Sequence, residues 1–340
     1  MNEILSKLNQ KKPLNAEEMT RAMESLMTGK LADNEVEQFL LLLREKGESV
    51  EEIVAAAHVM RKHSLKLSKH YPDLLDTCGT GGDAKNTVNV STLSAIVAAS
   101  AGALVGKHGN RSVSSVCGSA DLLEMLGMNI NLSNRAIEMS IETVGFGFFF
   151  APLFHPAIRF AMPARKKIQG KTIFNILGPL SNPAGAGHQL IGVYSEALVK
   201  TMAEALFKLG TKKAMVVHGS DGLDEITTCG ETFVAEVDQT GVKTYFISGE
   251  EFGFSRAKLR DLQSASKTEC KEAAKRTLEG EAGPPFDIVC LNAGAALYVA
   301  GRTKAFAEGV NLAKELMQSG EALEKLEEIV AFSQREAGMP

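Results

Sequence analysis

The sequence predicts an α/β protein with a small all-helical domain at its N-terminus and a larger domain built on a mainly parallel sheet. The chain has 340 residues, a length that suits two domains better than one. Residues 1–72 show only helical patterns, whereas residues 73–340 alternate short apolar strands with helices. Such alternation implies parallel strands with helices covering both faces of the sheet.

The helical pattern of the first domain is marked by its capping signals. Residues 15–18 and 49–52 each predict a capping box, in which an Asn or Ser side chain and a Glu side chain satisfy free backbone N–H groups. Apolar residues then recur at helical spacing over residues 19–27, 36–43 and 53–60. Short connections predict antiparallel packing of these helices. We expect most of their apolar side chains in a core and the remainder in a dimer contact.

The larger domain is predicted to begin after Tyr71-Pro72-Asp73, where the pattern changes. Each predicted strand is a short apolar run, and each predicted helix carries apolar residues at helical spacing. The predicted strands cover residues 74–75, 103–105, 146–150, 190–193 and 214–217, followed by a hairpin of residues 232–237 and 243–247. The predicted helices cover residues 91–101, 119–126, 197–209, 305–316 and 321–331.

Composition and charge exclude several classes of protein. With 37 basic and 41 acidic residues the formal net charge is −4, whereas a dedicated nucleic-acid binder usually shows a clear basic excess. The 5 cysteines lack the spacing of zinc ligands, which favours reduced thiols in a cytoplasmic protein. No apolar run reaches the roughly 18 residues of a membrane-spanning helix, and residues 1–10 do not resemble a signal peptide. We therefore expect a cytoplasmic protein without nucleic-acid or membrane partners.

A glycine-rich loop, residues 76–83, lies between a predicted strand and a predicted helix. Gly79, Gly81 and Gly82 can adopt positive φ angles and let backbone N–H groups approach a phosphate. Residues 86–91 then lead into a helix, whose N-terminus favours negative charge. Taken alone, this pattern predicts either a phosphate cradle or a plain tight turn.

Two familiar nucleotide-binding motifs fail in this chain. Residues 79–84 fit the loose dinucleotide pattern G-x-G-x-x-A, but that pattern needs an acidic residue about where Lys107 stands. This mismatch argues against a dinucleotide oxidoreductase. Gly170-Lys171-Thr172 resembles the end of a P-loop, but Arg165 occupies the place of that motif's first glycine.

Two further polar segments follow predicted strands. Residues 107–115 combine basic, amide and hydroxyl side chains too densely for a plain connection, and Ser119 then starts a helix that it can cap, or contacts a phosphate. Asp224 and Glu225 follow the strand at residues 214–217; a carboxylate pair there suits Mg²⁺, although a polar turn would look the same. Because the carboxyl ends of parallel strands meet at one edge of a sheet, we expect residues 107–115 beside the glycine loop.

In their order and spacing, these segments resemble those of the anthranilate phosphoribosyltransferase family. Pyrimidine nucleoside phosphorylases have a similar fold and a glycine-rich loop, but they are longer and carry a different first loop. A paralogue that only binds a ligand is a third alternative, against which the intact Asp224-Glu225 pair argues. The resemblance covers nearly the whole chain and rests on residues 76–83, 89–92, 107–115, 118–121, 155–157, 172–183 and 224–225.

The resemblance implies a nucleoside phosphorylase/phosphoribosyltransferase-like fold, in which part of residues 155–185 joins the helical domain in space. It implies an active site between the two domains and a homodimer formed through the helical domains. It further implies transfer of the phosphoribosyl group of phosphoribosyl pyrophosphate to the amine of anthranilate, giving N-(5-phosphoribosyl)anthranilate and pyrophosphate in tryptophan biosynthesis. Magnesium is the implied cofactor.

The resemblance also implies roles for individual residues. Ser91, Asp224 and Glu225 would hold Mg²⁺. Anthranilate would bind at Asn110 and Arg165, with Gly79 and His108 near it, and a guanidinium suits a carboxylate because it donates two parallel hydrogen bonds. Phosphoribosyl pyrophosphate would bind at Gly79, Gly82, Asp83, Thr87, Asn89, Val90, Ser91, Thr92, Lys107, His108, Gly109, Asn110, Arg111, Ser112, Val113, Ser114, Ser115 and Ser119.

One role stays open, and two segments depart from the family pattern. His108 could accept the proton that the amine releases, or it could only line the pocket. Lys166-Lys167-Ile168 follow Arg165 where the family often has arginine, glutamate and leucine. Val116-Cys117 stand where lysine and serine are expected.

Overall fold

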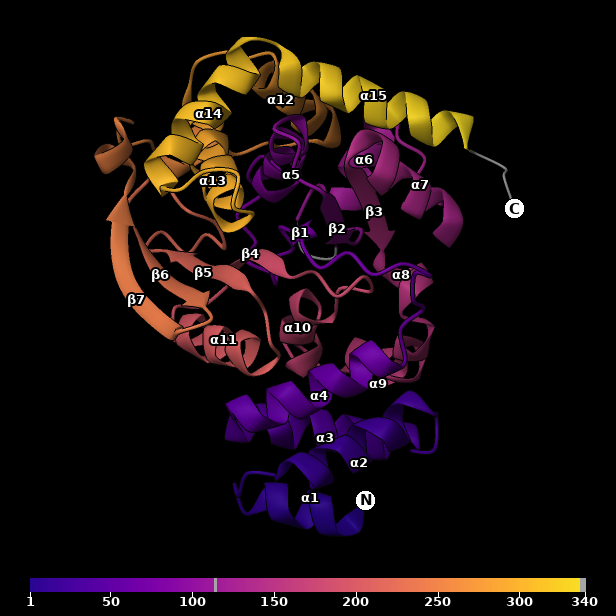
Figure 1. Cartoon of the computed structure of the whole chain (residues 1–340). Coiled ribbons are helices and arrows are strands. Elements are labelled where there is room, and N and C mark those ends of the chain that lie inside the picture. Colours follow the sequence, from indigo (N-terminus) through magenta and orange to yellow (C-terminus); the bar gives the residue numbers. More distant parts are fainter. Residues whose placement is uncertain (113–114, 337–340) are drawn as a thin grey trace.

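A computed structural model describes residues 1–112 and 115–336 of the chain. Its N-terminal helices form a layer below a larger α/β body (Figure 1), as the sequence predicts. Both predicted capping boxes are present, because the side chains of Asn15 and Ser49 accept the N–H groups of Glu18 and Glu52. The helices of this layer are α1 (Asn2–Asn9), α2 (Ala16–Met27), α3 (Asp33–Lys46) and α4 (Val50–Lys62).

The larger body is built on a seven-stranded sheet with the strand order β3-β2-β1-β4-β5-β6-β7. The strands β3 to β5 in this order are parallel, and β6 and β7 are added as antiparallel strands at one edge. The prediction of a mainly parallel sheet is therefore confirmed. The strands are β1 (Leu75–Asp76), β2 (Val105–Gly109), β3 (Phe146–Phe150), β4 (His188–Gly192), β5 (Lys213–Gly219), β6 (Glu231–Asp238) and β7 (Gly241–Ser248).

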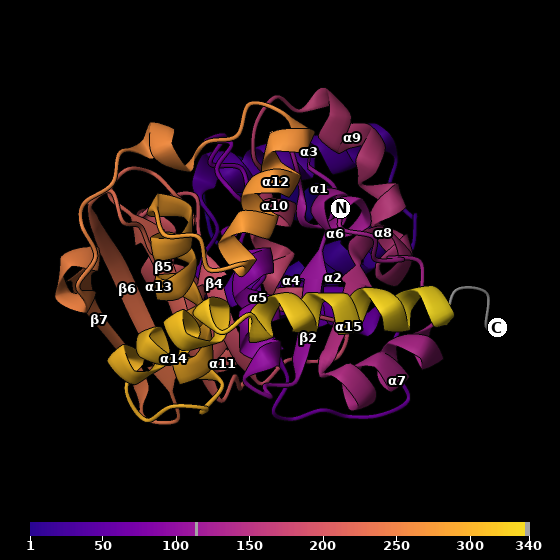
Figure 2. The same ribbon diagram turned by 90° about the horizontal axis from the view of Figure 1, so that it is seen from above.

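Helices cover both faces of the sheet. Successive side chains of a strand point to opposite faces, so the apolar strands present apolar side chains on both. Leu190 and Met215 face one helical layer, and Ile191 and Val216 face the other. The first layer contains α5 (Val90–Ser100), α6 (Ser119–Met125), α12 (Lys267–Leu278), α13 (Pro284–Val299), α14 (Phe306–Gln318) and α15 (Glu321–Arg335). Seen from above, α15 crosses α5 and α7 (Asn134–Val144), against which it packs (Figure 2).

The second face of the sheet joins the body to the N-terminal helices. Its apolar side chains share one hydrophobic cluster with α11 (Ala197–Lys208), with α9 (Met162–Lys167) and α10 (Ile173–Leu177), and with α1 to α4. The segment between β3 and β4 therefore packs on the N-terminal layer although it is distant in sequence. It also contains the short helix α8 (Ala151–Phe154). No helix in the described part of the chain is long and apolar enough to cross a membrane.

The ends of two strands differ from the sequence prediction. Lys107 and His108 were expected in a loop after the second strand, but they lie within β2 and pair with Phe148 and Phe149 of β3. His218 likewise lies within β5 and not after it. An apolar pattern stops where side chains become polar, whereas the ladder continues as long as a neighbouring strand offers backbone partners. The glycine loop and the Asp224-Glu225 pair remain outside the strands, as predicted.

Candidate active site

A cavity of about 640 Å³ lies between the loops at the carboxyl ends of the parallel strands and the helices α4, α8, α9 and α10. Segments more than a hundred residues apart in sequence meet there. Val113 and Ser114 lie outside the described residues. Every other candidate from the sequence lines the cavity: Gly79, Gly82, Asp83, Thr87, Asn89, Val90, Ser91, Thr92, Lys107, His108, Gly109, Asn110, Arg111, Ser112, Ser115, Ser119, Arg165, Asp224 and Glu225.

The glycine loop is fixed to the end of β4. The N–H of Thr80 donates to the carbonyl oxygen of Gly192 over 2.8 Å, and the N–H of Tyr194 donates to Thr80 Oγ1 over 3.1 Å. Gly81 and Gly82 have φ angles of 62° and 82°, which residues with a Cβ adopt only at a cost. The loop therefore holds a fixed shape in which its backbone is exposed to the cavity.

The residues after the glycine loop store backbone strain. Ala84 and Asn86 both have a φ angle of 57°, in the left-handed region. Asn86 is held there from both sides, since its Oδ1 accepts the N–H of Val116 over 3.0 Å and its carbonyl oxygen accepts the N–H of Ser264 over 2.8 Å. Such residues cost on the order of 1–3 kcal/mol each and cluster at ligand clamps. The strain is consistent with a loop shaped for a ligand.

The N-terminus of α5 gives the same wall of the cavity positive charge. Its N-cap residue Asn89 makes no side-chain cap and donates instead to the carbonyl oxygen of Cys117 over 3.1 Å. Lys107 is only 2% exposed, and its Nζ lies 3.3 Å from the carbonyl oxygen of Thr77 and 3.5 Å from Ser91 Oγ. A helix N-terminus beside a buried ammonium group is a suitable site for phosphate.

Asp224 and Glu225 place two carboxyl groups close to that wall. Burial, with the charge of Asp83, raises the pKa of Asp224 to about 7, and burial beside Asp224 raises the pKa of Glu225 well above its usual range. Glu225 Oε1 accepts the N–H of Ser91 over 3.2 Å, and neither carboxyl forms an ion pair with a described residue. Gly192 permits this placement, since a Cβ there would lie 1.5 Å from the carbonyl oxygen of Asp224. Half-buried carboxyl oxygens that form no ion pair with a described residue fit a divalent cation.

The loop after β2 is braced by α6. Ser119 Oγ accepts the N–H of Asn110 and can donate to its carbonyl oxygen, both over 3.2 Å. The guanidinium group of Arg111 pairs with Glu124, where Nη2 and Oε1 are 2.9 Å apart, and lies 3.5 Å from Asp121. Because its charge is already used within the protein, Arg111 offers a ligand its backbone more readily than its guanidinium group.

Arg165 lies on α9, on the side of the cavity that belongs to the helical layer. Its guanidinium carbon lies 5.3 Å from the centre of the Phe174 ring, and burial lowers the pKa of Arg165. No carboxylate of a described residue forms an ion pair with it. A half-buried guanidinium group without a protein partner suits a small carboxylate ligand.

Two histidines line the cavity near Arg165. The ring of His108 lies 5.0 Å from that of His155, centre to centre. His108 Nδ1 is 3.2 Å from the carbonyl oxygen of Gly178, so Nδ1 carries the proton and Nε2, which has no partner among the described residues, can accept one. Burial lowers the pKa of His108 to about 3 and that of His155 to about 4. Both rings are therefore neutral at pH 7, and His108 is a weak base.

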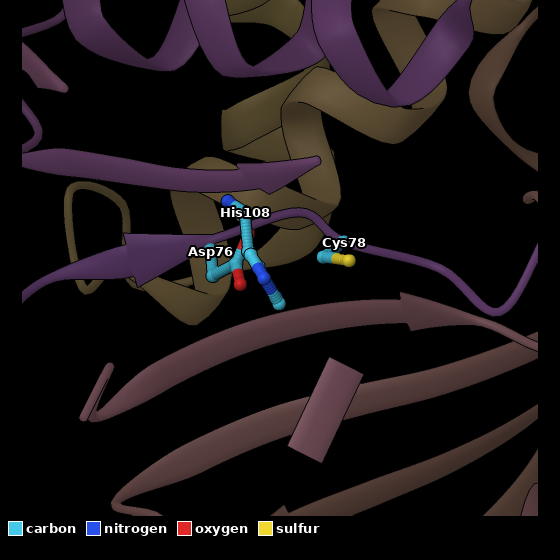
Figure 3. Close-up of side chains that lie close together, drawn as sticks. All are labelled: Asp76, Cys78 and His108. Carbon is cyan, nitrogen blue, oxygen red and sulfur yellow. Dashed lines mark hydrogen bonds between the residues drawn. The ribbon is translucent and has the colours of Figure 1, made fainter. Parts of the chain in front are cut away.

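Asp76, Cys78 and His108 form a cluster that resembles a metal site (Figure 3), with ligand atoms within 4.8 Å of one another. Both oxygens of Asp76 are already occupied: Oδ1 accepts the N–H of His108 over 3.1 Å, and Oδ2 accepts Asn182 Nδ2 over 2.8 Å. Burial raises the pKa of Asp76 to about 6 and keeps the Cys78 thiol protonated by raising its pKa. The cluster therefore braces the ends of β1 and β2 and does not suit a metal ion.

Two polar cavity residues from the segment between β3 and β4, His155 and Lys171, received no role from the sequence. His155 entered only as part of the family pattern, and Lys171 entered only as the end of a failed P-loop. Both lie between β3 and β4 and reach the cavity from the side of the helical layer. The signal for Lys171 was a glycine-lysine-threonine run, but its position relative to the glycine loop depends on contacts that are distant in sequence.

Comparison with known families agrees with this two-part architecture. Residues 71–323 match a family described as the glycosyl transferase family, a/b domain. Residues 2–64 match the glycosyl transferase family, helical bundle domain. The two matches together cover most of the chain and divide it near the predicted boundary.

Individual relatives are similar over nearly their whole length. An anthranilate phosphoribosyltransferase of Nitrosomonas eutropha is 46% identical over 331 residues, which is 97% of each chain. One of Alkalilimnicola ehrlichii is 49% identical over 92% of this chain and 93% of its own. The crystal structure of the Thermus thermophilus enzyme matches with a TM-score of 0.92 and 44% identity, over 97% of this chain and 99% of that one. The Saccharomyces cerevisiae enzyme in complex with PRPP and Mg matches with a TM-score of 0.89 and 28% identity, over 98% and 97%.

Proposed function

We propose that this chain, which belongs to the anthranilate phosphoribosyltransferase family, transfers the phosphoribosyl group of phosphoribosyl pyrophosphate to the amine of anthranilate. The products would be N-(5-phosphoribosyl)anthranilate and pyrophosphate, formed in tryptophan biosynthesis. One observation carries the proposal: a phosphate-binding wall, a half-buried carboxyl pair and a guanidinium group meet in one cavity, and neither the pair nor the guanidinium group forms an ion pair with a described residue.

The donor would lie along the wall formed by the glycine loop and the N-terminus of α5. Backbone N–H groups near Gly79 and Gly82, the hydroxyl groups of Ser91 and Thr92, and the ammonium group of Lys107 supply the donors that a pyrophosphate needs. Thr92 Oγ1 is buried and has no partner among the described residues, so a hydrogen bond there is available.

Asp224, Glu225 and Ser91 fit a magnesium site. Their oxygen atoms suit the metal, and the two carboxyl groups have no cationic partner in the described chain. When bound, magnesium would supply positive charge against the pyrophosphate that leaves from ribose C1. The yeast relative was crystallised with PRPP and Mg, which supports the assignment.

The acceptor would lie on the opposite side of the cavity. Arg165 would hold the anthranilate carboxylate, with Asn110, Gly79 and His108 beside the ring and the amine. An aromatic amine is neutral at pH 7, so attack on C1 needs position more than a strong base. Since burial lowers the pKa of His108 to about 3, we assign its free Nε2 the role of accepting a hydrogen bond from the amine, with water as final proton acceptor.

The transition state would carry positive charge on the ribose, as in other transfers at an anomeric carbon. The pyrophosphate oxygens then gain the electrons of the broken C1–O bond, and the N–H donors of the glycine loop stabilise them. Excluding water limits hydrolysis of the donor. The segment that carries Arg165 packs on the helical layer, so movement of that layer toward the sheet would close the cavity.

We also propose that residues 1–72, joined in space by part of residues 155–185, form a helical domain through which two chains dimerise. The residues Leu5, Leu41 and Leu42 of α1 and α3 remain half exposed, which supports a contact there. A cytoplasmic location is supported by the cysteines, all of which are free thiols.

The direct test is to incubate the protein with anthranilate, phosphoribosyl pyrophosphate and Mg²⁺ and to follow the loss of anthranilate fluorescence. We expect anthranilate fluorescence to fall only when the protein, phosphoribosyl pyrophosphate and Mg²⁺ are all present. If anthranilate fluorescence persists when folded protein is present with both substrates and Mg²⁺, the proposed function is wrong. Phosphorolysis of a pyrimidine nucleoside in the same sample would instead favour the nucleoside phosphorylase alternative.

A further inference from the structure

Lys171 reaches toward the phosphate wall from the opposite side of the cavity. It follows α9 and precedes α10, so it belongs to the segment that packs on the helical layer. Its side chain nevertheless closes on the glycine loop. A Cβ placed on Gly82 would lie 3.2 Å from Lys171 Cε and 3.6 Å from Nζ.

The ammonium group of Lys171 has no ionic or hydrogen-bonded protein partner among the described residues. It lies 3.3 Å from the centre of the Tyr194 ring, in a cation–π contact. Asp83 and Asp224 are near enough to act on its charge, but neither forms an ion pair with it. A half-buried cation that rests on an aromatic face beside a phosphate cradle can move to an anionic ligand without breaking a salt bridge.

The position of Lys171 is set by the helical layer. Arg44 of α3 donates from Nη1 to the carbonyl oxygen of Gln169 over 2.9 Å. Gly170 has a φ angle of 108°, and a Cβ there would lie 3.2 Å from Arg44 Nη1. On the other side, Ile173 and Phe174 are buried in the hydrophobic cluster of the helical layer. Movement of this layer toward the sheet would therefore carry Lys171 toward the glycine loop.

We propose that Lys171 is a phosphate-binding residue, which leaves the Tyr194 ring to contact the pyrophosphate group of the donor held by the glycine loop. The inference rests on the proposed function and adds a cation that crosses the cavity from the side of the acceptor. Lysine suits this role because its ammonium group acts as a point charge with freely rotating donors. The charge would hold the donor in the ground state and the pyrophosphate product after transfer.

Steady-state kinetics of Lys171→Met and Lys171→Arg test this role. Methionine keeps the aliphatic packing on Tyr194 and removes the charge, whereas arginine keeps the charge. We expect Lys171→Met to raise KM for phosphoribosyl pyrophosphate, and the inhibition constant of magnesium pyrophosphate, by about tenfold to a hundredfold. KM for anthranilate should change by less than about twofold, and Lys171→Arg should restore most of the loss.

Lys166→Met is the matched control, since Lys166 is an exposed lysine of the same segment. Equal behaviour of Lys166→Met and Lys171→Met would overturn the inference, as would an equal rise of both KM values or a failure of arginine to rescue. These outcomes leave the proposed function intact because they need an active wild-type protein. If the wild type itself neither binds the donor nor consumes anthranilate, the proposed function fails, and the inference fails with it.

Discussion

Two glutamates, one buried and one half-buried, show how differently the helical layer and the cavity use charge. Glu52, at the start of α4, is wholly buried, but Lys46 Nζ lies 2.7 Å from its Oε2, and the N–H groups of Leu14 and Ser49 donate to its two oxygens. Glu225 accepts a single N–H group, that of Ser91, and no described cation pairs with it. Glu52 is removed from water and is compensated within the protein, whereas Glu225 is half-buried at the cavity and has no cationic partner among the described residues.

The difference separates an ionisable group that is paired within the protein from one that is left available to a ligand, which we call a reserved charge. A carboxyl group without a cationic partner is costly to ionise in a partly buried site, so the raised pKa of Glu225 favours its neutral form until a ligand supplies positive charge. The same contrast holds for cations: Lys46 is paired within the helical layer, whereas Arg165 and Lys171 at the cavity form no ion pair with any residue that the structure describes. We therefore expect substitutions in the helical layer to reduce stability and substitutions at the cavity to reduce activity.

The largest expected effect comes from Asp224→Asn combined with Glu225→Gln. We predict a fall in turnover of about a thousandfold and a shift of the magnesium titration to higher concentration, because ligand oxygens and charge are lost. The ligand-free protein should melt at about the same temperature, because the raised pKa values of Asp224 and Glu225 favour their neutral forms, which amides replace with little change of shape. Kinetics and thermal melting of the same preparation check this. A strong loss of stability, or an unaltered magnesium titration, would contradict the reserved-charge account.

Glu52→Gln should give the opposite result. Breaking a buried, hydrogen-bonded ion pair leaves Lys46 uncompensated, and we predict a loss of about 3 kcal/mol in the free energy of unfolding. The kinetic constants of the protein that remains folded should not change. Urea denaturation with Glu51→Gln, an exposed neighbour, as control measures the loss. The contrast breaks down if Glu52→Gln lowers kcat/KM at temperatures where the fold is intact.

Arg165→Ala should separate the two substrates. We predict that KM for anthranilate rises about tenfold to a hundredfold, because a charged hydrogen bond is lost, while KM for phosphoribosyl pyrophosphate changes little. Varying each substrate in turn at saturation of the other gives the two constants. Equal effects on both constants would mean that Arg165 shapes the cavity as a whole and does not hold the carboxylate.

The smallest net effect is expected for the pH dependence of stability, because two groups at the site act in opposite directions. The pKa of His155 is lowered from 6.5 to about 4, so between these values the unfolded chain binds a proton that the folded protein does not. The free energy of unfolding should therefore fall as pH drops from about 6.5 to about 4, by up to about 1.4 kcal/mol per pH unit. Asp76, with its pKa raised to about 6, acts in the opposite direction, since the folded protein keeps its proton.

Comparison of wild type with His155→Gln isolates the histidine from Asp76. Thermal melting curves of the two proteins should converge as pH falls, because the substituted protein lacks the protonation penalty. Parallel curves across this range would show that His155 already binds its proton in the folded state.

Short-range signals predicted most of the fold. The capping boxes at residues 15–18 and 49–52 needed only a four-residue pattern, and both form. The strand at residues 146–150 has the ends that its aromatic run predicted. The end of β2 was predicted wrongly because Lys107 and His108 are polar, while their pairing with β3 depends on a strand about 40 residues away.

The candidate site divides in the same way. Glycines, hydroxyl groups and the Asp224-Glu225 pair could be recognised as residue types in order along the chain. Their positions and partners could not be predicted: Asp224 approaches the glycine loop only because Gly192 leaves room, and the guanidinium group of Arg111 is paired with Glu124. Lys171 was set aside as part of a failed motif, although its contacts place it beside Gly82. Residues distant in sequence therefore decide which charged side chains are paired within the protein and which remain available to a ligand.

The most direct measurement is a calorimetric titration of phosphoribosyl pyrophosphate into the protein, with and without Mg²⁺. If the cavity reserves Asp224 and Glu225 for a cation and its opposite wall for phosphate, binding of the donor should depend strongly on Mg²⁺ in the wild type. That dependence should disappear in Asp224→Asn with Glu225→Gln. Binding of equal affinity with and without Mg²⁺ in the wild type would contradict the claim that these buried charges are kept for the ligand.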